Sequence, residues 1–283
     1  EKQYKDKVST AYIEHNTKAN EFTYDRTDEQ LRKMTDPLKK SDIEFITKFM
    51  TEKYNQIRIS KDTKETILKQ TKQYYQYEKK RMYLKESKKA VKKATLNYEL
   101  NLKDIKTISL LSESDLLFIT DHGTNTQLMR DLQRLMIDGI DKKLTGQDIA
   151  GLLRNQLSSL TPEKYAAIFG EQAYWEMVTN TNVVRTSAFN NINNLEDMGY
   201  SRYKISTRGA LACPICAPYS GREYTTASAR KKMDQYLKYA SQGNIDKMKD
   251  VYTFGTANVS GLGETPPFHP NCYCEIESIE EFD

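Results

Sequence analysis

The sequence is poor in residues that interrupt helices. The first hundred residues contain no glycine, and Pro37 is their only proline. Glycine and proline are the residues least compatible with a helix interior, so this region can form long uninterrupted helices. Hydrophobic residues make up only 38% of the chain and charged residues 29%. That balance is typical of an elongated helical body with a large solvated surface.

Long apolar runs and a targeting leader are also lacking. No apolar segment approaches the roughly 20 residues that span a bilayer, and the opening residues Glu1–Lys5 contain no apolar signal core. We therefore expect a reducing compartment, where the four cysteines would serve as metal ligands or free thiols in preference to disulfides. The net charge of +4 says little about partners.

Apolar residues recur at helical spacing along most of the chain. Ser41–Glu44 resembles a capping box that opens a helix containing Ile43, Ile46, Phe49 and Met50. Amphipathic spacing predicts a second helix over Gln127–Asp138. Thr145 is expected to cap a third.

A longer helix is expected to follow, since Thr161-Pro162 is a strong start signal and Gly199 a typical end. The segment from Pro162 to about Met198 is therefore predicted to be one helix. Asp121–Thr124 is predicted to be a loop that precedes the helix over Gln127–Asp138. We expect His15 and His122 to lie at the surface or in loops, and Trp175 to be a core anchor.

Apolar residues become more frequent between Lys103 and Phe118, which makes this segment a candidate domain boundary. We accordingly expect three regions: a Lys/Tyr-rich helical region over 1–105, a helical body over 106–200, and a small α+β module over 201–283. The predicted fold class is mostly α, with a long-helix N-terminal body and a metal-stapled C-terminal module.

A basic stretch runs from Lys61 to Lys93, with twelve lysines and arginines against four acidic residues and with interleaved tyrosines: Tyr74, Tyr75, Tyr77 and Tyr83. One interpretation is contact with nucleic acid or an acidic surface. The other, which charge runs more commonly reflect, is a solvated helix face whose tyrosines pack on the body.

Strand and loop patterns begin after Gly199. Alternation predicts short strands at Tyr203–Ser206 and Arg222–Thr225, and a closing strand at Tyr273–Ile279. A helix is expected from Ser228 to about Val251. The stretch Thr256–Pro267 is rich in Gly, Pro, Ser and Thr and is expected to be a loop.

Two elements in this region carry metal-ligand spacing. Cys213 and Cys216 form a C-x2-C element, and His269, Cys272 and Cys274 form an H-x2-C-x-C element about fifty residues later. Together they offer five donors to an ion that takes four at a structural zinc site. The favoured set is Cys213, Cys216, His269 and Cys272, and the alternative replaces His269 with Cys274. A pair of disulfides and free buried thiols are the rival interpretations.

Such a zinc site would be structural. A full set of protein ligands leaves no position for the water that catalytic zinc needs. No glutamate follows His269 in a hydrolytic pattern, no base is evident beside Cys213, and no phosphate-binding loop or dinucleotide fingerprint is present.

The order of these motifs resembles the phage head morphogenesis family, the Mu protein F-like minor capsid proteins. The resemblance covers about Trp175 to Ile279. It is carried by these features in sequence order: Thr181-Asn182 and Arg185 on a long helix, Gly199 to Tyr203, Cys213 and Cys216 with Gly221 and Tyr224, and the closing hexapeptide His269–Cys274. The chain departs from the family at Asn182, where Glu is common, at Ala210–Ala212, and in a helix inserted near Ser228–Asp250.

The resemblance implies a non-enzymatic minor virion protein of a tailed phage. Its partners would be the portal and capsid or scaffold proteins, with packaged DNA as a contact of the Lys61–Lys93 region and ejection with the DNA as a further property. It would assemble in the host cytoplasm and reside inside the head. The alternatives are a nucleic-acid-binding zinc-module protein and, less favoured, a phage-derived nuclease or toxin fusion fragment. An N-terminal catalytic domain would need clustered acids and histidines, and residues 1–100 offer only His15.

Overall fold

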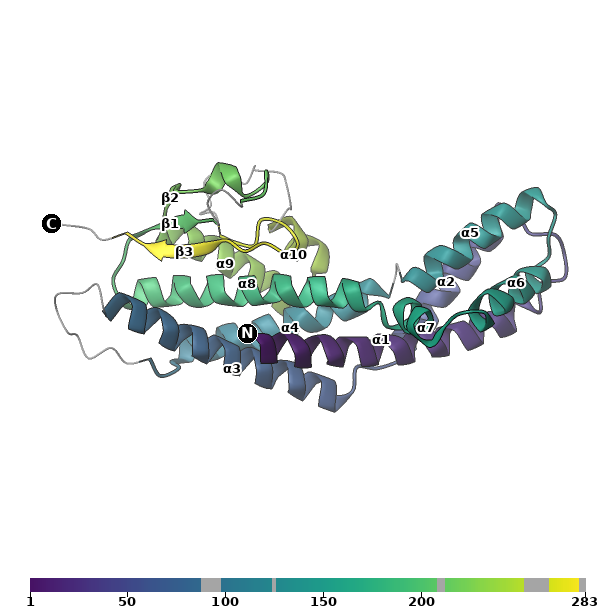
Figure 1. Ribbon diagram of the computed structural model, residues 1–283, viewed down its shortest axis with the longest axis horizontal. Helices are drawn as coiled ribbons and strands as arrows, with labels where there is room; N and C mark the ends of the chain where they lie inside the picture. Colours follow the sequence, from purple (N-terminus) through teal and green to yellow (C-terminus); the bar gives the residue numbers. More distant parts are fainter. Residues whose placement is uncertain (88–97, 124–125, 208–211, 252–264, 280–283) are drawn as a thin grey trace. The chain divides into compact units, whose positions relative to one another are not determined.

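The protein is mostly helical, with one small antiparallel sheet near the C-terminus (Figure 1). A computed structural model describes residues 1–87, 98–123, 126–207, 212–251 and 265–279. The predicted fold class, a mostly α chain with a small α+β module that contains a Cys/His cluster, is confirmed. Among the described residues, no helix has the length and apolarity needed to cross a membrane.

The described residues form two compact units, each built from segments that are distant in sequence. Unit 1 comprises Glu1–Val8, Glu65–Leu117 and Glu176–Asp283, and unit 2 comprises Ser9–Lys64 and Phe118–Trp175. This grouping differs from the three consecutive regions expected from the sequence. The expected boundary at 105/106 falls inside the continuous helix Leu102–His122, and the two units divide later in the same helix, between Leu117 and Phe118.

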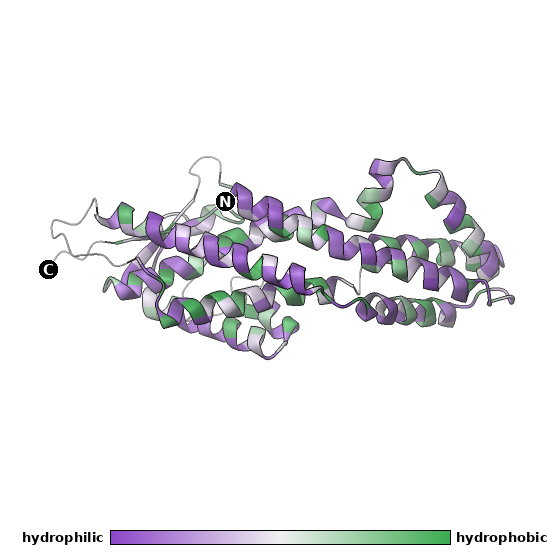
Figure 2. Ribbon diagram, turned by 90° about the horizontal axis from the view of Figure 1, so that it is seen from below, coloured by the Kyte–Doolittle hydropathy of each residue, from purple (hydrophilic) through white to green (hydrophobic). Residues whose placement is uncertain are grey.

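Three long helices contribute residues to both units: α1 (Lys2–Leu31), α4 (Leu102–His122) and α8 (Gln172–Asp197). A fourth, α3 (Lys61–Ser87), lies almost entirely in unit 1. Each helix carries both hydrophilic and hydrophobic residues along its length (Figure 2). This amphipathic pattern lets a helix bury one face and leave the other in water.

Unit 2 contains α2 (Lys40–Gln56), α5 (Gln127–Asp141), α6 (Gly146–Ser158) and α7 (Pro162–Gly170). Its core is a single apolar cluster that includes Leu31, Ile46, Met50, Leu132, Met136, Ile149, Leu153 and Phe169. The predicted caps Thr145 and Thr161 are confirmed, since each accepts a hydrogen bond from a backbone N–H of the helix that follows.

The cap of α2 lies two residues earlier than predicted. The helix begins at Lys40, and the carboxylate of Asp42 accepts a hydrogen bond from the backbone N–H of Lys39 at 2.8 Å. Asp42 therefore performs the reciprocal role that the sequence pattern had assigned to Glu44. Ile46 and Met50 are buried as expected, whereas Ile43 and Phe49 are half-buried.

The single helix predicted from Pro162 to Met198 is wrong. The chain breaks at Glu171, which adopts a left-handed conformation with φ of 48° between α7 and α8. The break allows the Glu171 carboxylate to accept hydrogen bonds from the backbone N–H of Gln127, at 2.9 Å, and from Asn16, at 3.2 Å. These contacts, made with residues distant in sequence, override the local helical pattern.

The expectation that both early histidines lie at the surface is also wrong. His15 and His122 are 6% and 5% exposed. His122 ends α4, where a loop was expected, and its Nε2 lies 2.6 Å from Oε2 of Glu171. Its ring stacks on Tyr174 with the centroids 3.9 Å apart. Trp175 is fully buried, as predicted.

Unit 1 packs segments of α1, α3, α4 and α8 with α9 (Thr226–Ser241), α10 (Ile245–Val251) and the sheet. The single helix expected over Ser228–Val251 is two helices, because the chain turns at Gly243, where φ is +64°. A turn of this kind favours glycine, which has no Cβ to clash at positive φ.

The sheet has the order β2-β1-β3, with β1 (Arg202–Ser206) in the centre. Both neighbours, β2 (Glu223–Thr225) and β3 (Glu275–Ser278), are antiparallel to it, and Ile205 pairs with Ile276. The three predicted strands are confirmed to within one or two residues at their ends. Gly199, with φ of +81°, ends α8 as predicted. Residues 256–264 of the predicted loop lie outside the described residues.

The basic stretch is partly buried. Lys79 is 1% exposed, and Tyr74, Tyr75 and Tyr83 are buried as the packing interpretation expected, while Tyr77 is exposed. Lys88, Lys89, Lys92 and Lys93 lie outside the described residues.

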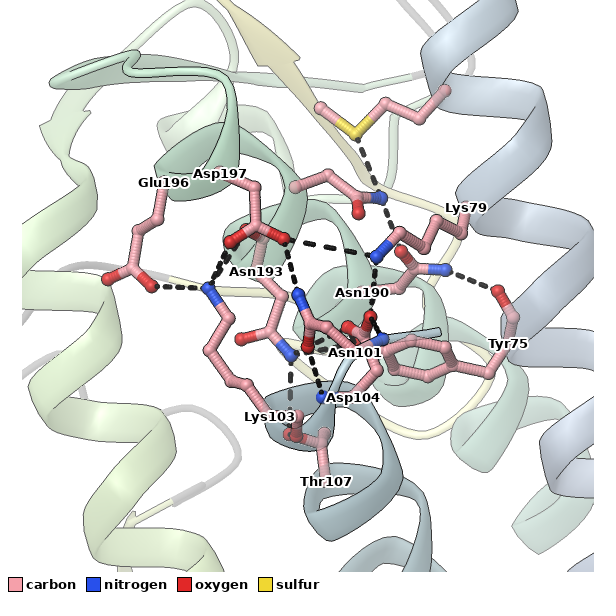
Figure 3. A network of polar contacts seen from close by, with 12 residues as sticks. Tyr75, Lys79, Asn101, Lys103, Asp104, Thr107, Asn190, Asn193, Glu196 and Asp197 are labelled. Carbon is pink, nitrogen blue, oxygen red and sulfur yellow. Dashed lines mark hydrogen bonds and ion pairs between the residues drawn. The ribbon is translucent and has the colours of Figure 1, made fainter. Parts of the chain in front are cut away.

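A buried polar network surrounds Lys79 inside unit 1 (Figure 3). Its ammonium lies 2.5 Å from Oδ2 of Asp104, whose Oδ1 accepts from the Tyr75 hydroxyl at 2.8 Å. Asn193 donates to the same hydroxyl at 2.7 Å. Asp104 also closes a capping box at the start of α4, because it exchanges backbone-to-side-chain hydrogen bonds with Asn101.

Candidate metal centre

The first ligand element is a tight turn that follows β1. The Cys213 carbonyl accepts hydrogen bonds from the backbone N–H groups of Cys216, at 3.0 Å, and Ala217, at 2.9 Å. A short 3-10 helix, Ala217–Tyr219, continues from this turn. The turn brings the two cysteines to the same side of the chain, as the two-residue spacing predicted.

The second element is a turn that precedes β3. The backbone N–H of Cys272 donates to the His269 carbonyl at 3.2 Å, and Asn271 adopts a left-handed conformation with φ of 58°. Asparagine is among the few non-glycine residues that adopt this conformation readily. Cys272 and Cys274 precede β3 and do not lie in the strand itself.

Two contacts bring the turns together. β1 and β3 pair directly, so the chain leaving β1 and the chain entering β3 lie at the same end of the sheet. The ring of Tyr219, just after the first turn, stacks on Phe268, just before the second, with centroids 4.0 Å apart and planes 8° apart. Residues separated by more than fifty positions thereby converge.

All five predicted ligands meet. Cys213, Cys216 and His269 form one group, and Cys216, Cys272 and Cys274 form another, with the donor atoms of each group within 4.8 Å of one another. Cys216 belongs to both groups and lies at the centre of the cluster. The arrangement can hold a metal ion, and all four cysteines are free thiols, so the disulfide alternative is not what the structure has.

The donor spacing agrees with tetrahedral coordination. The Sγ atoms of Cys216 and Cys272 lie 3.8 Å apart, and two thiolates on a tetrahedral zinc are separated by about 3.8 Å when each bond is about 2.3 Å. Nε2 of His269 lies 3.1 Å from the Cys213 sulfur and 3.0 Å from the Cys216 sulfur. A bound ion would widen these two separations to about 3.5 Å.

The protein environment favours a thiolate at one sulfur. Hydrogen bonds from the Cys274 thiol, and then from backbone N–H groups, lower the pKa of Cys272 to about 5 against its desolvation. Burial raises the pKa of Cys216 to about 12. The pKa of Cys274 is raised because its thiol proton is shared with the Cys272 sulfur. Thiolate is the form that binds a metal, so Cys272 is prepared for that role.

Neighbouring groups orient the ligands. Nδ1 of His269 lies 2.6 Å from the Pro270 carbonyl, which leaves Nε2 directed to the sulfurs. The turn is attached to α8 through Asn271: its side-chain oxygen accepts from Asn180 at 3.1 Å, and its backbone N–H donates to the Thr181 hydroxyl at 3.4 Å. Such contacts fix ligand geometry in metal sites.

Sequence reasoning singled out Thr181 and Arg185 without giving them a role. Thr181 supports the ligand turn. Arg185 is 2% exposed, donates to Asn182 at 2.8 Å and lies over the Tyr236 ring at 5.2 Å. Asn180 was missed, because one half-buried asparagine on a helix has no sequence pattern that marks a role.

A hollow of about 270 Å³ borders the cluster and is lined in part by Cys213, Cys216, His269 and Cys274. Cys213 is half-exposed, whereas the other three cysteines are buried. The cluster is thus open to solvent on the Cys213 side and closed on the Cys272 side.

Comparison with protein-family models, with curated proteins and with solved structures found no match in any of the three. The resemblance to a family therefore stands on the motifs of the sequence, and the fold stands on the structure alone.

Proposed function

We propose that the protein is a non-enzymatic minor capsid protein that acts in the head morphogenesis of a tailed phage. In this proposal it associates with the portal and with capsid or scaffold proteins, assembles in the host cytoplasm and resides inside the head. The C-terminal module with its metal centre would serve as the folded attachment unit.

One observation carries the proposal. The separate pieces of the motif order, namely the Thr181–Arg185 helix, the C-x2-C turn and the H-P-N-C-x-C hexapeptide, belong to a single site in space. Thr181 binds the backbone of Asn271, which lies within the hexapeptide, and Cys216 belongs to both ligand groups. Motifs that met by chance would not be expected to support one another in this way.

Zinc is the proposed metal. Thiolate and imidazole donors at tetrahedral spacing suit it, and its role at such a site is to cross-link the chain. The proposed ligands are Cys213, Cys216, His269 and Cys272, since each has a short donor-to-donor contact with another member of this set. Cys274 would then hold the Cys272 sulfur in place through its thiol.

The proposal is tested by co-purification. The chain, carrying an affinity tag, is expressed with the portal protein encoded in the same genome, and the Cys272→Ser variant is expressed alongside. A stoichiometric complex is expected with the native chain and a weaker one with the variant. Absence of the chain from purified virions, together with no portal complex, would refute the assignment.

Contact with packaged DNA is a second proposed activity, favoured by the exposed basic residues of α3: Lys61, Lys64, Lys69, Lys72, Lys80, Arg81 and Lys85. Binding of this kind weakens steeply with salt because it releases counterions. We expect duplex DNA binding at low salt that declines as salt rises. Binding that is absent or insensitive to salt would contradict this contact.

A further inference from the structure

A second hollow, of about 270 Å³, lies entirely within unit 2. Its lining comes from α1, from the end of α2, from the segment that connects α2 to α3, from the start of α3, and from α4. The lining residues are His15, Tyr54, Asn55, Ile57, Arg58, Ile59, Lys64, Ile119 and Thr120. The volume is close to the lower end of the range for small-molecule sites, about 300 Å³, so it suits a small ligand.

The imidazole of His15 lines the hollow, and its ring nitrogens form no hydrogen bond with another described residue. His15 as a whole is 6% exposed. The His15 ring packs edge-on against the Tyr54 ring, with centroids 6.3 Å apart. The two nitrogens are not among the buried polar atoms that lack a partner, so solvent reaches them and they are open to a ligand in the hollow.

The charges in the lining are of one sign. Arg58 and Lys64 are exposed beside the hollow, no acidic residue contributes to the lining, and neither cation forms an ion pair with another described residue. Two unpaired cations at the edge of one hollow create a local positive potential.

We propose that this hollow binds a small phosphate-bearing ligand, with Arg58 and Lys64 on the phosphate and His15 completing its hydrogen bonds. A phosphate monoester carries a charge of about −1.5 to −2 at pH 7, which balances two cations, whereas a carboxylate carries only one. Arginine and lysine are the residues that most often bind phosphate.

The remaining lining indicates what carries the phosphate. Ile57, Ile59 and Ile119 give the hollow an apolar side, and Tyr54, Asn55 and Thr120 add polar groups. The Tyr54 hydroxyl already donates to Asn16 at 2.6 Å, so its role is to fix the lining. Asn55 and Thr120 are the polar residues left to contact the ligand. A phosphate on a compact apolar body matches this lining better than inorganic phosphate alone.

Histidine-selective NMR tests the proposal directly, because the chain contains only three histidines. The full chain is titrated with phenyl phosphate, inorganic phosphate and acetate at constant ionic strength. We expect a saturable shift of the His15 signal, with phenyl phosphate binding more tightly than inorganic phosphate and acetate giving no saturable shift. The His122 and His269 signals should not move.

Matched variants separate a site from general electrostatics. Arg58→Gln and Lys64→Gln should each weaken phenyl phosphate binding about tenfold, the effect of losing one charge-assisted hydrogen bond. Arg134→Gln and Lys48→Gln remove exposed cations from the same unit, on α5 and α2, and should leave binding unchanged. The proposal is overturned by the absence of a saturable His15 shift, by equal binding of acetate, or by equal losses in all four variants.

Discussion

At the residue scale, the least expected feature is that a lysine from a strongly basic segment lies in the protein interior. Lys79 is 1% exposed and its ion pair with Asp104 is completely buried. A buried pair of this kind adds little net stability, because removing two charges from water costs about as much as their attraction returns. Its effect is mainly on specificity, since the unit must close with α3 and α4 in one register to pair the two charges.

The pair gives a sharp stability prediction. Asp104→Asn leaves the buried Lys79 ammonium with only the more distant carboxylate of Asp197, at 3.9 Å, which should lower the free energy of unfolding of unit 1 by about 3 kcal/mol. The measurement is amide hydrogen exchange in α3 and α4. Asp246→Asn, an exposed acid on α10, is the control and should have little effect.

The double variant Lys79→Met, Asp104→Asn tests the cause. It removes the buried charge altogether and should recover much of the lost stability. If the double variant is no more stable than Asp104→Asn alone, burial of an unpaired charge is not the cause.

A second interior carboxylate predicts a pH dependence. Asp115 is 2% exposed, and burial raises its pKa to about 7 from an ordinary value of 3.8, against the opposing effects of Arg185 on α8 and the Tyr4 hydroxyl on α1. Tyr236 on α9 is also near enough to interact with its charge. The folded protein therefore holds a proton that the unfolded chain releases between these two pH values.

The sign follows from this difference in proton binding. The contribution of Asp115 to the free energy of unfolding is largest below about pH 4 and falls as the pH rises to about 7, by at most about 4 kcal/mol for a shift of about three pKa units. Urea unfolding of Asp115→Asn should lack this decline. Equal pH slopes in the native chain and the variant would show that Asp115 does not titrate in this range.

At the element scale, three helix ends were predicted correctly because a single residue sets the local geometry at each of them. Thr145, Thr161 and Gly199 act within one turn of themselves, so their patterns predict structure directly. The break at Glu171 had no local signal, because it is set by Asn16, His122 and Gln127, which are distant in sequence. The capping box of Asn101 and Asp104 was present in the sequence as a pattern and could have been found.

Glu171 therefore joins several elements of unit 2, and its loss should be costly. Glu171→Ala removes the acceptor of the Gln127 backbone N–H and the buried partner of His122, and should lower the unfolding free energy of unit 2 by about 2–4 kcal/mol. Fluorescence of Trp175, the only tryptophan and a fully buried one, reports on this unit. Glu52→Ala, an exposed change on α2, serves as the control.

At the scale of the whole molecule, the sequence predicted which residues meet in the candidate metal centre but not how they are held. Cysteine and histidine spacing is a local chemical pattern, so the five candidates could be named from it. The Tyr219–Phe268 stack and the anchoring of Asn271 to α8 depend on which segments meet, and spacing contains no such information. The division into two units escaped prediction for the same reason, since α1, α4 and α8 each serve both.

The most direct test of the account is the metal content of the protein, purified without added zinc or chelator, measured by elemental analysis with Cys272→Ser alongside. The account predicts about one zinc ion per chain in the native protein, its loss in the variant, and loss of hydrogen-exchange protection in β1 and β3 only when the metal is absent. A native protein that holds no metal, with four reactive thiols and a fully protected sheet, would contradict the metal centre and remove the main support for the proposed function.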